Sequence, residues 1–185
     1  NDQRMEKFEL KAWVHVPKSF GVVGLTKTIL RSFNSSADGE DLDPLICRLQ
    51  EKLTSKKFLL VLDDVWTGNE ECWERILLPL NRGSSESKIV VTTRETQVAL
   101  FMKSDHQVPL QRLEENYCWS LFVKHAFQGK NEFEYPELQS IGKKILEKCG
   151  GLPLAVKTLG NLLQRKFSQD EWFKILETDM WHVSE

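Results

Sequence analysis

Two adjacent carboxylates, Asp63 and Asp64, are the residues of this chain best suited to chemistry. They follow the apolar run 58–62, which is too short to cross a membrane and lacks the alternation of a half-exposed strand. We therefore expect a strand covered on both faces, as in a parallel sheet, whose C-terminal end faces a ligand crevice. Magnesium prefers oxygen ligands, so one interpretation is a magnesium site beside a phosphate chain. A core strand followed by a turn is the alternative.

A second β-branched run, residues 88–93, ends beside Arg94. In parallel order its end would lie near the end of the Asp63 strand, where a guanidinium can bind a terminal phosphate through paired N–H groups. A surface arginine after a strand is the alternative, but the nearby acid pair favours phosphate binding. The sequence thus predicts a magnesium end and a phosphate-sensing end on adjacent strands.

Residues 21–28 match the phosphate-cradling pattern G-x-x-x-x-G-K-[ST] only superficially. That loop needs glycine directly before lysine, whereas Thr26 precedes Lys27 here and Gly24 lies three residues away. We therefore expect an ordinary amphipathic helix with Gly21 near its start and Lys27 on the surface.

Strand and helix patterns alternate through the first part of the chain. Strand patterns occupy residues 11–16, 58–62 and 88–93, and helical spacing occupies residues 22–33, 43–53 and 70–78. Asp43 before Pro44 predicts an N-cap for the second of these helices. The order predicts a parallel α/β sheet with right-handed crossovers.

From about residue 111 the pattern is purely helical. We expect helices over residues 114–127 and 136–149, a third from Pro153, and a fourth after a capping box at Ser168–Glu171. The predicted domains are therefore residues 1–110, an α/β domain, and residues 111–185, a helical one.

The composition excludes several classes of protein. The net charge of −2, from 25 basic and 27 acidic residues, gives no general attraction to nucleic acid or anionic membranes. The four cysteines and four histidines do not cluster, which argues against a zinc site. No apolar run approaches 18 residues, so no transmembrane segment is expected. The start, Asn-Asp-Gln, is no signal peptide, and the chain looks like an internal piece.

Five segments follow one another along the chain in a specific order, namely residues 11–16, 57–66, 87–94, 117–122 and 149–155. This order resembles the NB-ARC region of plant nucleotide-binding leucine-rich-repeat immune receptors over nearly the whole chain. The second segment ends in Trp66, and in this it resembles the coiled-coil class of these receptors. The resemblance implies a truncated P-loop NTPase-type parallel sheet with flanking helices, followed by a small all-α subdomain of the ARC1 type.

The family implies a cytoplasmic ADP/ATP-dependent switch that controls defence. At most it is a slow ATPase in the intact parent protein. Its partners would be the coiled-coil and leucine-rich-repeat domains of the parent and, on activation, further copies of itself. The alternatives are a metabolic ATPase or phosphotransferase of the same fold and a nucleotide-free interaction module.

The resemblance also assigns roles to individual residues. Asp63 would hold Mg²⁺, through water, and Asp64 would help to orient the hydrolytic water. Arg94, with its neighbour Thr93, would contact the nucleotide, the arginine sensing the terminal phosphate.

The corner Gly150-Gly151-Leu152-Pro153-Leu154 joins two helices. Glycine supplies the conformations that end a helix, and Pro153 suits the start of the next, so a purely structural account suffices. A flat apolar contact with a base is the functional alternative. The resemblance implies that Pro153 and Leu154 touch the adenine of ADP or ATP.

Two elements of the family are expected outside these residues: the phosphate loop before residue 1 and a winged-helix domain after residue 185. The strand feeding the loop is expected between the Asp63 strand and the Arg94 strand. Without it, we expect two unpaired strand edges, poor stability and weak or absent nucleotide binding by the isolated residues.

Overall fold

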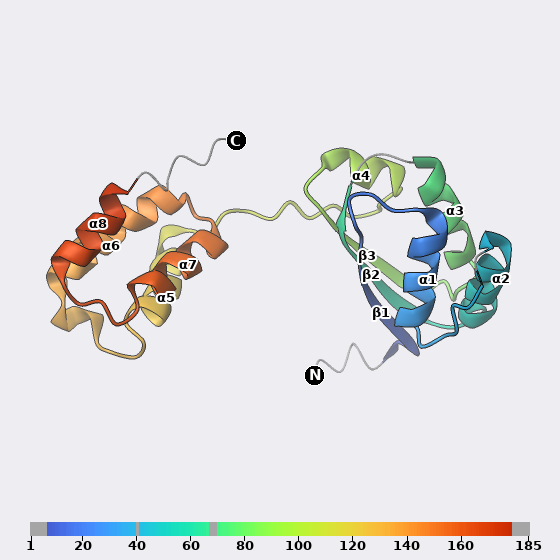
Figure 1. Cartoon of the computed structure of the whole chain (residues 1–185), viewed down its shortest axis with the longest axis horizontal. Coiled ribbons are helices and arrows are strands. Elements are labelled where there is room, and N and C mark those ends of the chain that lie inside the picture. Colours follow the sequence, from blue (N-terminus) through green and yellow to red (C-terminus); the bar gives the residue numbers. More distant parts are fainter. Residues whose placement is uncertain (1–6, 40, 67–69, 179–185) are drawn as a thin grey trace. The chain divides into compact units, whose positions relative to one another are not determined.

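The computed structural model describes residues 7–39, 41–66 and 70–178, and the chain divides into two compact units, residues 1–107 and 108–185. The predicted fold class, a parallel α/β sheet followed by helices, is confirmed (Figure 1). The first unit contains β1 (Leu10–His15), α1 (Val22–Ser32), α2 (Leu42–Leu53), β2 (Phe58–Val65), α3 (Glu70–Leu80), β3 (Lys88–Thr93) and α4 (Thr96–Phe101). The second contains α5 (Glu115–Ala126), the 3₁₀ turn η2 (Glu132–Glu134), α6 (Pro136–Cys149), α7 (Pro153–Leu163) and α8 (Gln169–Glu177).

The sheet has the order β1-β2-β3 with every pair parallel. The expected gap between the Asp63 strand and the Arg94 strand is wrong, because β2 pairs directly with β3, with Leu60 opposite Ile89. Backbone N–H and C=O groups along two facing edges are satisfied when the strands pair, which favours this arrangement.

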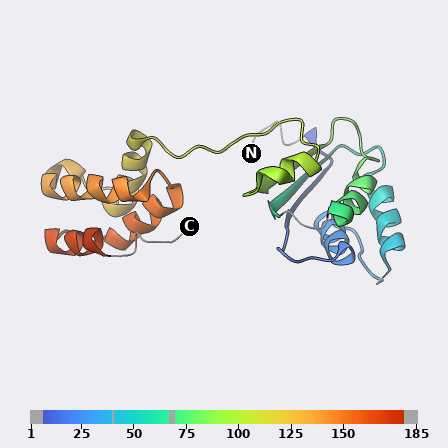
Figure 2. The ribbon, with the colours of Figure 1, turned by 90° about the horizontal axis from the view of Figure 1, so that it is seen from above.

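The helices α1, α2 and α3 all lie on one face of the sheet (Figures 1 and 2). The prediction of a strand covered on both faces is therefore wrong. The residues of β2 alternate between buried (Phe58, Leu60, Leu62) and half-buried (Leu59, Val61). On the open face Val61 is flanked by Trp13 and Val90, which are 66% and 48% exposed. Crossovers of one hand that advance in one direction across a sheet place their helices on the same face.

Of two predicted helix starts in the first unit, that of α1 is correct and that of α2 is not. The segment that superficially matches a phosphate loop is helical in α1, as predicted, with Gly21 as its N-cap and Lys27 half-buried rather than fully exposed. The predicted N-cap of α2 is wrong: the helix is preceded by Asp41, and Asp43 lies in its first turn. A carboxylate there still complements the positive end of the helix dipole.

The second unit closes around an aromatic centre. Phe122, Phe127 and Trp172 are at most 1% exposed, and the Trp172 ring lies 5.6 Å from each phenylalanine ring. The Trp172 indole N–H donates to the carbonyl of Lys166 at 2.8 Å. The starts of α6 and α7 are as predicted, but the capping box before α8 is not formed, since Ser168 makes no capping hydrogen bond.

Candidate functional site

The end of β2 carries a bulge that sets the direction of both carboxylates. Leu62 pairs with Val91, but Val65 pairs with Thr93, so β2 contains one extra residue in this interval. Asp64 has a φ of 59°, in the left-handed region that aspartate tolerates better than most residues. Adjacent residues of a regular strand point to opposite faces, and the bulge breaks this alternation. The strand also extends beyond the predicted residue 62, so Asp63 and Asp64 lie within it.

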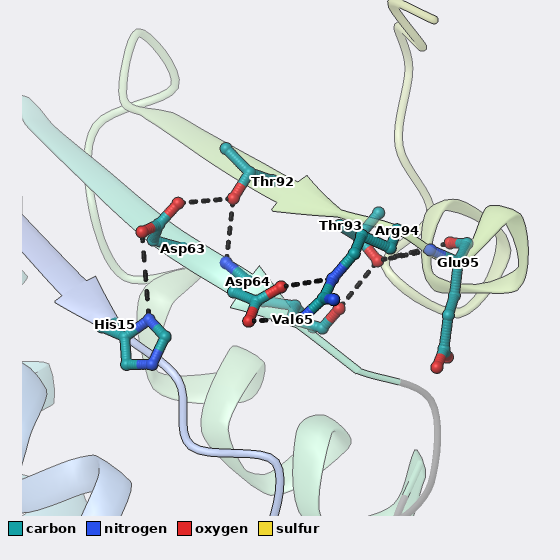
Figure 3. Close-up of polar contacts among 8 residues, drawn as sticks. All are labelled: His15, Asp63, Asp64, Val65, Thr92, Thr93, Arg94 and Glu95. Atoms are coloured by element: carbon teal, nitrogen blue, oxygen red, sulfur yellow. Dashed lines mark hydrogen bonds and ion pairs between the residues drawn. The ribbon is translucent and has the colours of Figure 1, made fainter. Parts of the chain in front are cut away.

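Thr92 of β3 holds the acid pair in place (Figure 3). Its hydroxyl donates to Asp63 Oδ1 at 2.6 Å and accepts the backbone N–H of Asp64 at 2.9 Å. The other carboxylate oxygen of Asp63 lies 3.9 Å from Nδ1 of His15, the last residue of β1. Side chains from all three strands thus meet at their carboxyl ends.

Arg94 forms a two-bond pair with Asp64. Its Nε donates to Oδ1 at 3.2 Å and its Nη2 to Oδ2 at 3.1 Å, so the guanidinium and carboxylate meet edge to edge (Figure 3). The Arg94 side chain is 68% exposed, and exposed pairs contribute only about 0.2–1 kcal/mol to stability. The pair therefore orients the guanidinium more than it stabilises the fold.

Thr93 ties the two strand ends together. Its hydroxyl donates to the carbonyl of Val65 at 2.7 Å and accepts the backbone N–H of Glu95 at 3.0 Å. The first bond ties the residue before Arg94 to the end of β2, and the second joins the two residues that flank Arg94, so together they fix where its side chain leaves the backbone.

The predicted site residues fall into two groups. Asp63, Asp64, Thr93 and Arg94 come together at the carboxyl ends of β2 and β3, in the first unit (Figure 3). Pro153 and Leu154 belong to the second unit. Both are exposed at the start of α7, and Leu154 is 76% exposed.

The corner before α7 requires both glycines. Gly150 and Gly151 have φ values of 55° and 76°. Arg112 Nη1 donates to the carbonyl of Gly150 at 2.7 Å, and the N–H of Leu113 donates to the carbonyl of Gly151 at 2.9 Å. A Cβ at Gly151 would lie 2.8 Å from the Leu113 oxygen. This clamp holds the corner so that Leu154 projects outward.

The acid pair fits a partial magnesium site. Within residues 7–39, 41–66 and 70–178, no group of three or more His, Cys, Asp or Glu side chains could hold a metal by itself. Mg²⁺, however, is commonly held by one or two carboxylates together with phosphate oxygens and water. The carboxylate of Asp63, on a side chain 36% exposed, fits such a set, whereas that of Asp64 is engaged by Arg94.

Sequence reasoning missed three members of the cluster, namely His15, Thr92 and Trp66. Thr92 contacts both acidic residues. The sequence did contain a signal for it, because Thr92 is a polar residue at the end of a β-branched run and directly precedes the predicted site residue Thr93. Trp66 follows β2, and its ring centroid lies 4.3 Å from Arg94 Cζ. The positions of aromatic residues along the sequence gave no signal of this contact.

The helices in the described part of the chain are all too short or too polar to cross a bilayer.

Comparisons with known proteins agree with the predicted resemblance. The profile of the NB-ARC domain matches residues 1–132. Disease resistance protein RGA2 of Solanum bulbocastanum is 38% identical over 186 residues, covering 99% of this chain and 19% of RGA2. Disease resistance RPP13-like protein 4 of Arabidopsis thaliana is 36% identical over 182 residues, covering 96% of this chain and 21% of the relative. Disease resistance protein RPM1 of the same plant is 33% identical over 190 residues, covering 96% and 20%.

The chain thus spans about a fifth of the length of these relatives. The family match nevertheless extends over most of its residues and includes the whole strand-end cluster. The chain therefore belongs to the NB-ARC family of nucleotide-binding domains.

Proposed function

We propose that this chain is the ADP/ATP-binding switch segment of a cytoplasmic plant immune receptor that controls the defence response. The observation that supports it is the meeting of Asp63, Asp64 and Arg94 at the ends of two adjacent parallel strands. The names of the relatives, all disease resistance proteins, support the biological setting. Its proposed partners are the coiled-coil and leucine-rich-repeat domains of the parent protein and, in the active state, further copies of the receptor.

Asp63 is the proposed ligand of Mg²⁺, acting through water. Thr92 donates to one of its oxygens and leaves the other directed toward His15, so the carboxylate has a fixed orientation. When bound, Mg²⁺ would neutralise charge on the phosphate oxygens of ADP or ATP.

Arg94 is the proposed sensor of the terminal phosphate. A guanidinium binds carboxylate and phosphate with the same paired N–H geometry, so Asp64 occupies the edge of Arg94 that a phosphate would use. Transfer of Arg94 to the phosphate would release the carboxylate of Asp64, which could then orient a water for slow hydrolysis. Binding and hydrolysis would thereby be linked through one side chain.

The remaining proposed contacts come from Thr93, Pro153 and Leu154. The Thr93 hydroxyl donates to Val65 and accepts from Glu95, which leaves one lone pair for a water on the phosphate chain. Pro153 and Leu154 present a rigid apolar corner suited to the flat face of adenine.

The test is nucleotide binding by the full-length receptor that carries these residues. We expect the wild type to bind ADP and Mg·ATP, and Arg94→Ala to lower the affinity for ATP about 10- to 100-fold, in line with the loss of a hydrogen bond to a charged group. Asp63→Asn is expected to weaken the dependence of ATP binding on Mg²⁺. Equilibrium titration with each nucleotide, with and without Mg²⁺, measures both effects.

Arg75→Ala is the matched control, because Arg75 is an exposed arginine in the middle of α3 and takes part in none of the strand-end contacts described above. Absence of nucleotide binding by the wild type would refute the proposal. Equal affinities for ATP in the Arg94→Ala and Arg75→Ala variants would refute the role of Arg94.

A further inference from the structure

The indole of Trp66 is in contact with two cations from different loops. Arg94 Cζ lies 4.3 Å and Lys18 Nζ 4.7 Å from the ring centroid. Trp66 directly follows β2, Lys18 lies between β1 and α1, and Arg94 directly follows β3. One half-buried aromatic ring thus connects residues that follow each of the three strands.

We propose that Trp66 is a positioning residue for Arg94, which holds the guanidinium at the strand ends both before and after a phosphate replaces the carboxylate of Asp64. This inference rests on the proposed function, since it concerns how the terminal phosphate is sensed. It assigns Trp66 a role distinct from core packing.

The two contacts of Arg94 use different parts of the guanidinium. The pair with Asp64 consumes N–H groups on the edge, at 3.1 and 3.2 Å, and those are the groups a phosphate oxygen needs. A cation–π contact uses the charge of the guanidinium and the face of the ring and consumes no N–H donor. A phosphate therefore competes with Asp64 but not with Trp66.

The ring contact is comparable in strength to the ion pair. At an exposed site a cation–π contact changes an equilibrium by about 2- to 5-fold, and an exposed ion pair by a similar factor. If Asp64 alone held Arg94, the side chain would lose its orientation at the moment of exchange. With Trp66 present, about half of the free energy that orients the Arg94 side chain remains.

Lys18 places a second positive charge at the same ring. Like charges near one another raise the local potential for an anion. We therefore expect Lys18→Ala to weaken phosphate binding less than loss of Trp66 does, because Lys18→Ala removes one positive charge but leaves the ring that contacts Arg94 in place.

The first test needs no nucleotide. In ¹H–¹⁵N spectra of the 185-residue chain, the Nε–Hε resonance of Arg94 is identified by its absence from the Arg94→Lys variant. We expect the ring current of Trp66 to shift this resonance and the adjacent Hδ protons, with cross-relaxation to the indole. Trp66→Leu should abolish the shift, and Trp66→Phe should retain part of it.

Trp13→Leu is the matched control, since Trp13 is an exposed tryptophan of the same sheet and no cation contacts its ring within the described residues. An Arg94 resonance unchanged in Trp66→Leu would overturn the proposal. If Trp66→Leu failed to fold, the wild type would still decide the matter, because absence of cross-relaxation between Arg94 and the indole would overturn it as well.

The second test measures nucleotide affinity of the full-length receptor. We expect Trp66→Leu to lower the affinity for Mg·ATP about 2- to 5-fold and to leave that for ADP unchanged, because ADP lacks the terminal phosphate. Equal effects on both nucleotides, or none, would overturn positioning of Arg94 for the phosphate. A wild type that binds neither nucleotide refutes the proposed function, whereas the Arg94 resonance still reports separately whether Trp66 holds the guanidinium.

Discussion

The two units bury their apolar residues in different ways. In the α/β unit α1, α2 and α3 cover one face of the sheet, and the other face exposes Trp13 and Val90. In the helical unit the aromatic centre around Trp172 is enclosed by α5, α6 and α8 together with the loop before α8. The comparison indicates that the helical unit contains most of its own stabilising contacts, whereas the α/β unit combines a one-sided core with a polar cluster at its edge.

The largest effect is expected for Trp172→Ala in the helical unit. Removal of a fully buried tryptophan is expected to lower the free energy of unfolding by about 3–5 kcal/mol. Hydrogen exchange during denaturant titration should show the loss in α5 to α8 and leave the amides of β1 to β3 protected. Equal loss of protection in the sheet would contradict independent stability of the two units.

Trp73 and Trp172, the two buried tryptophans among the described residues, allow a direct comparison of the units. Trp172 donates its indole N–H to Lys166, whereas the Nε1 of buried Trp73 has no hydrogen-bond partner within the part of the chain that the structure describes. Trp172→Phe leaves a carbonyl without its donor, so it should cost about 1–3 kcal/mol more than Trp73→Phe, which removes an unpaired N–H. Chemical denaturation of both variants measures the difference. Equal losses of unfolding free energy in the two variants would show that the Trp172 hydrogen bond adds nothing to the stability of the helical unit.

The clamped corner predicts a further difference between the units. In the helical unit, Gly151→Ala combines a φ of 76° with a Cβ 2.8 Å from the Leu113 oxygen and should cost about 1–3 kcal/mol. Gly39→Ala, in the α/β unit, is the control, since Gly39 also has a positive φ of 98° but no neighbour within 4 Å of the added Cβ. Thermal unfolding of the two variants separates the backbone clash from the conformational cost. If Gly39→Ala were the more harmful change, the clamp would not be the cause.

The smallest effect is a dependence of stability on alkaline pH. Burial, with a smaller contribution from Cys118, raises the pKa of the Cys149 thiol from 9.0 to about 11. Between these values the unfolded chain releases a proton that the folded chain retains, so the helical unit should lose stability as the pH rises from 9 to about 11. Cys149→Ala should make this slope shallower in urea titrations at several pH values. A slope unchanged by the substitution would exclude Cys149 as its source.

The bounds of helices and strands were predicted well where they depend on residues adjacent in the sequence. Pro136 and the glycines at 150–151 bound α6 as predicted, and β3 has the bounds that its β-branched residues indicate. The open face of the sheet could not be predicted from β2 alone. Its apolar residues have no alternation, and which face is covered depends on the direction in which the chain crosses the sheet.

The site was predictable in part for the same reason. Parallel order alone brings the ends of β2 and β3 together, which is why Asp63, Asp64 and Arg94 could be expected in one place. The bulge at the end of β2 is accompanied by a hydrogen bond from the backbone N–H of Asp64 to Thr92 across the sheet, and the pairing of Arg94 with Asp64 depends on side-chain conformation. Neither is encoded in the spacing of the residues.

The left-handed backbone of Asp64 has a consequence for the choice of substitutions at this position. An alanine or a β-branched residue would remove the charge and also oppose a φ of 59°, so its phenotype would mix altered chemistry with conformational strain. Asparagine tolerates the left-handed region and has almost the shape of aspartate. Among single replacements, Asp64→Asn therefore removes the carboxylate with the least backbone strain, although it also replaces one acceptor of the Arg94 pair by a donor. The residues tolerated at position 64 should include asparagine and glycine for reasons of backbone geometry, before any selection for activity.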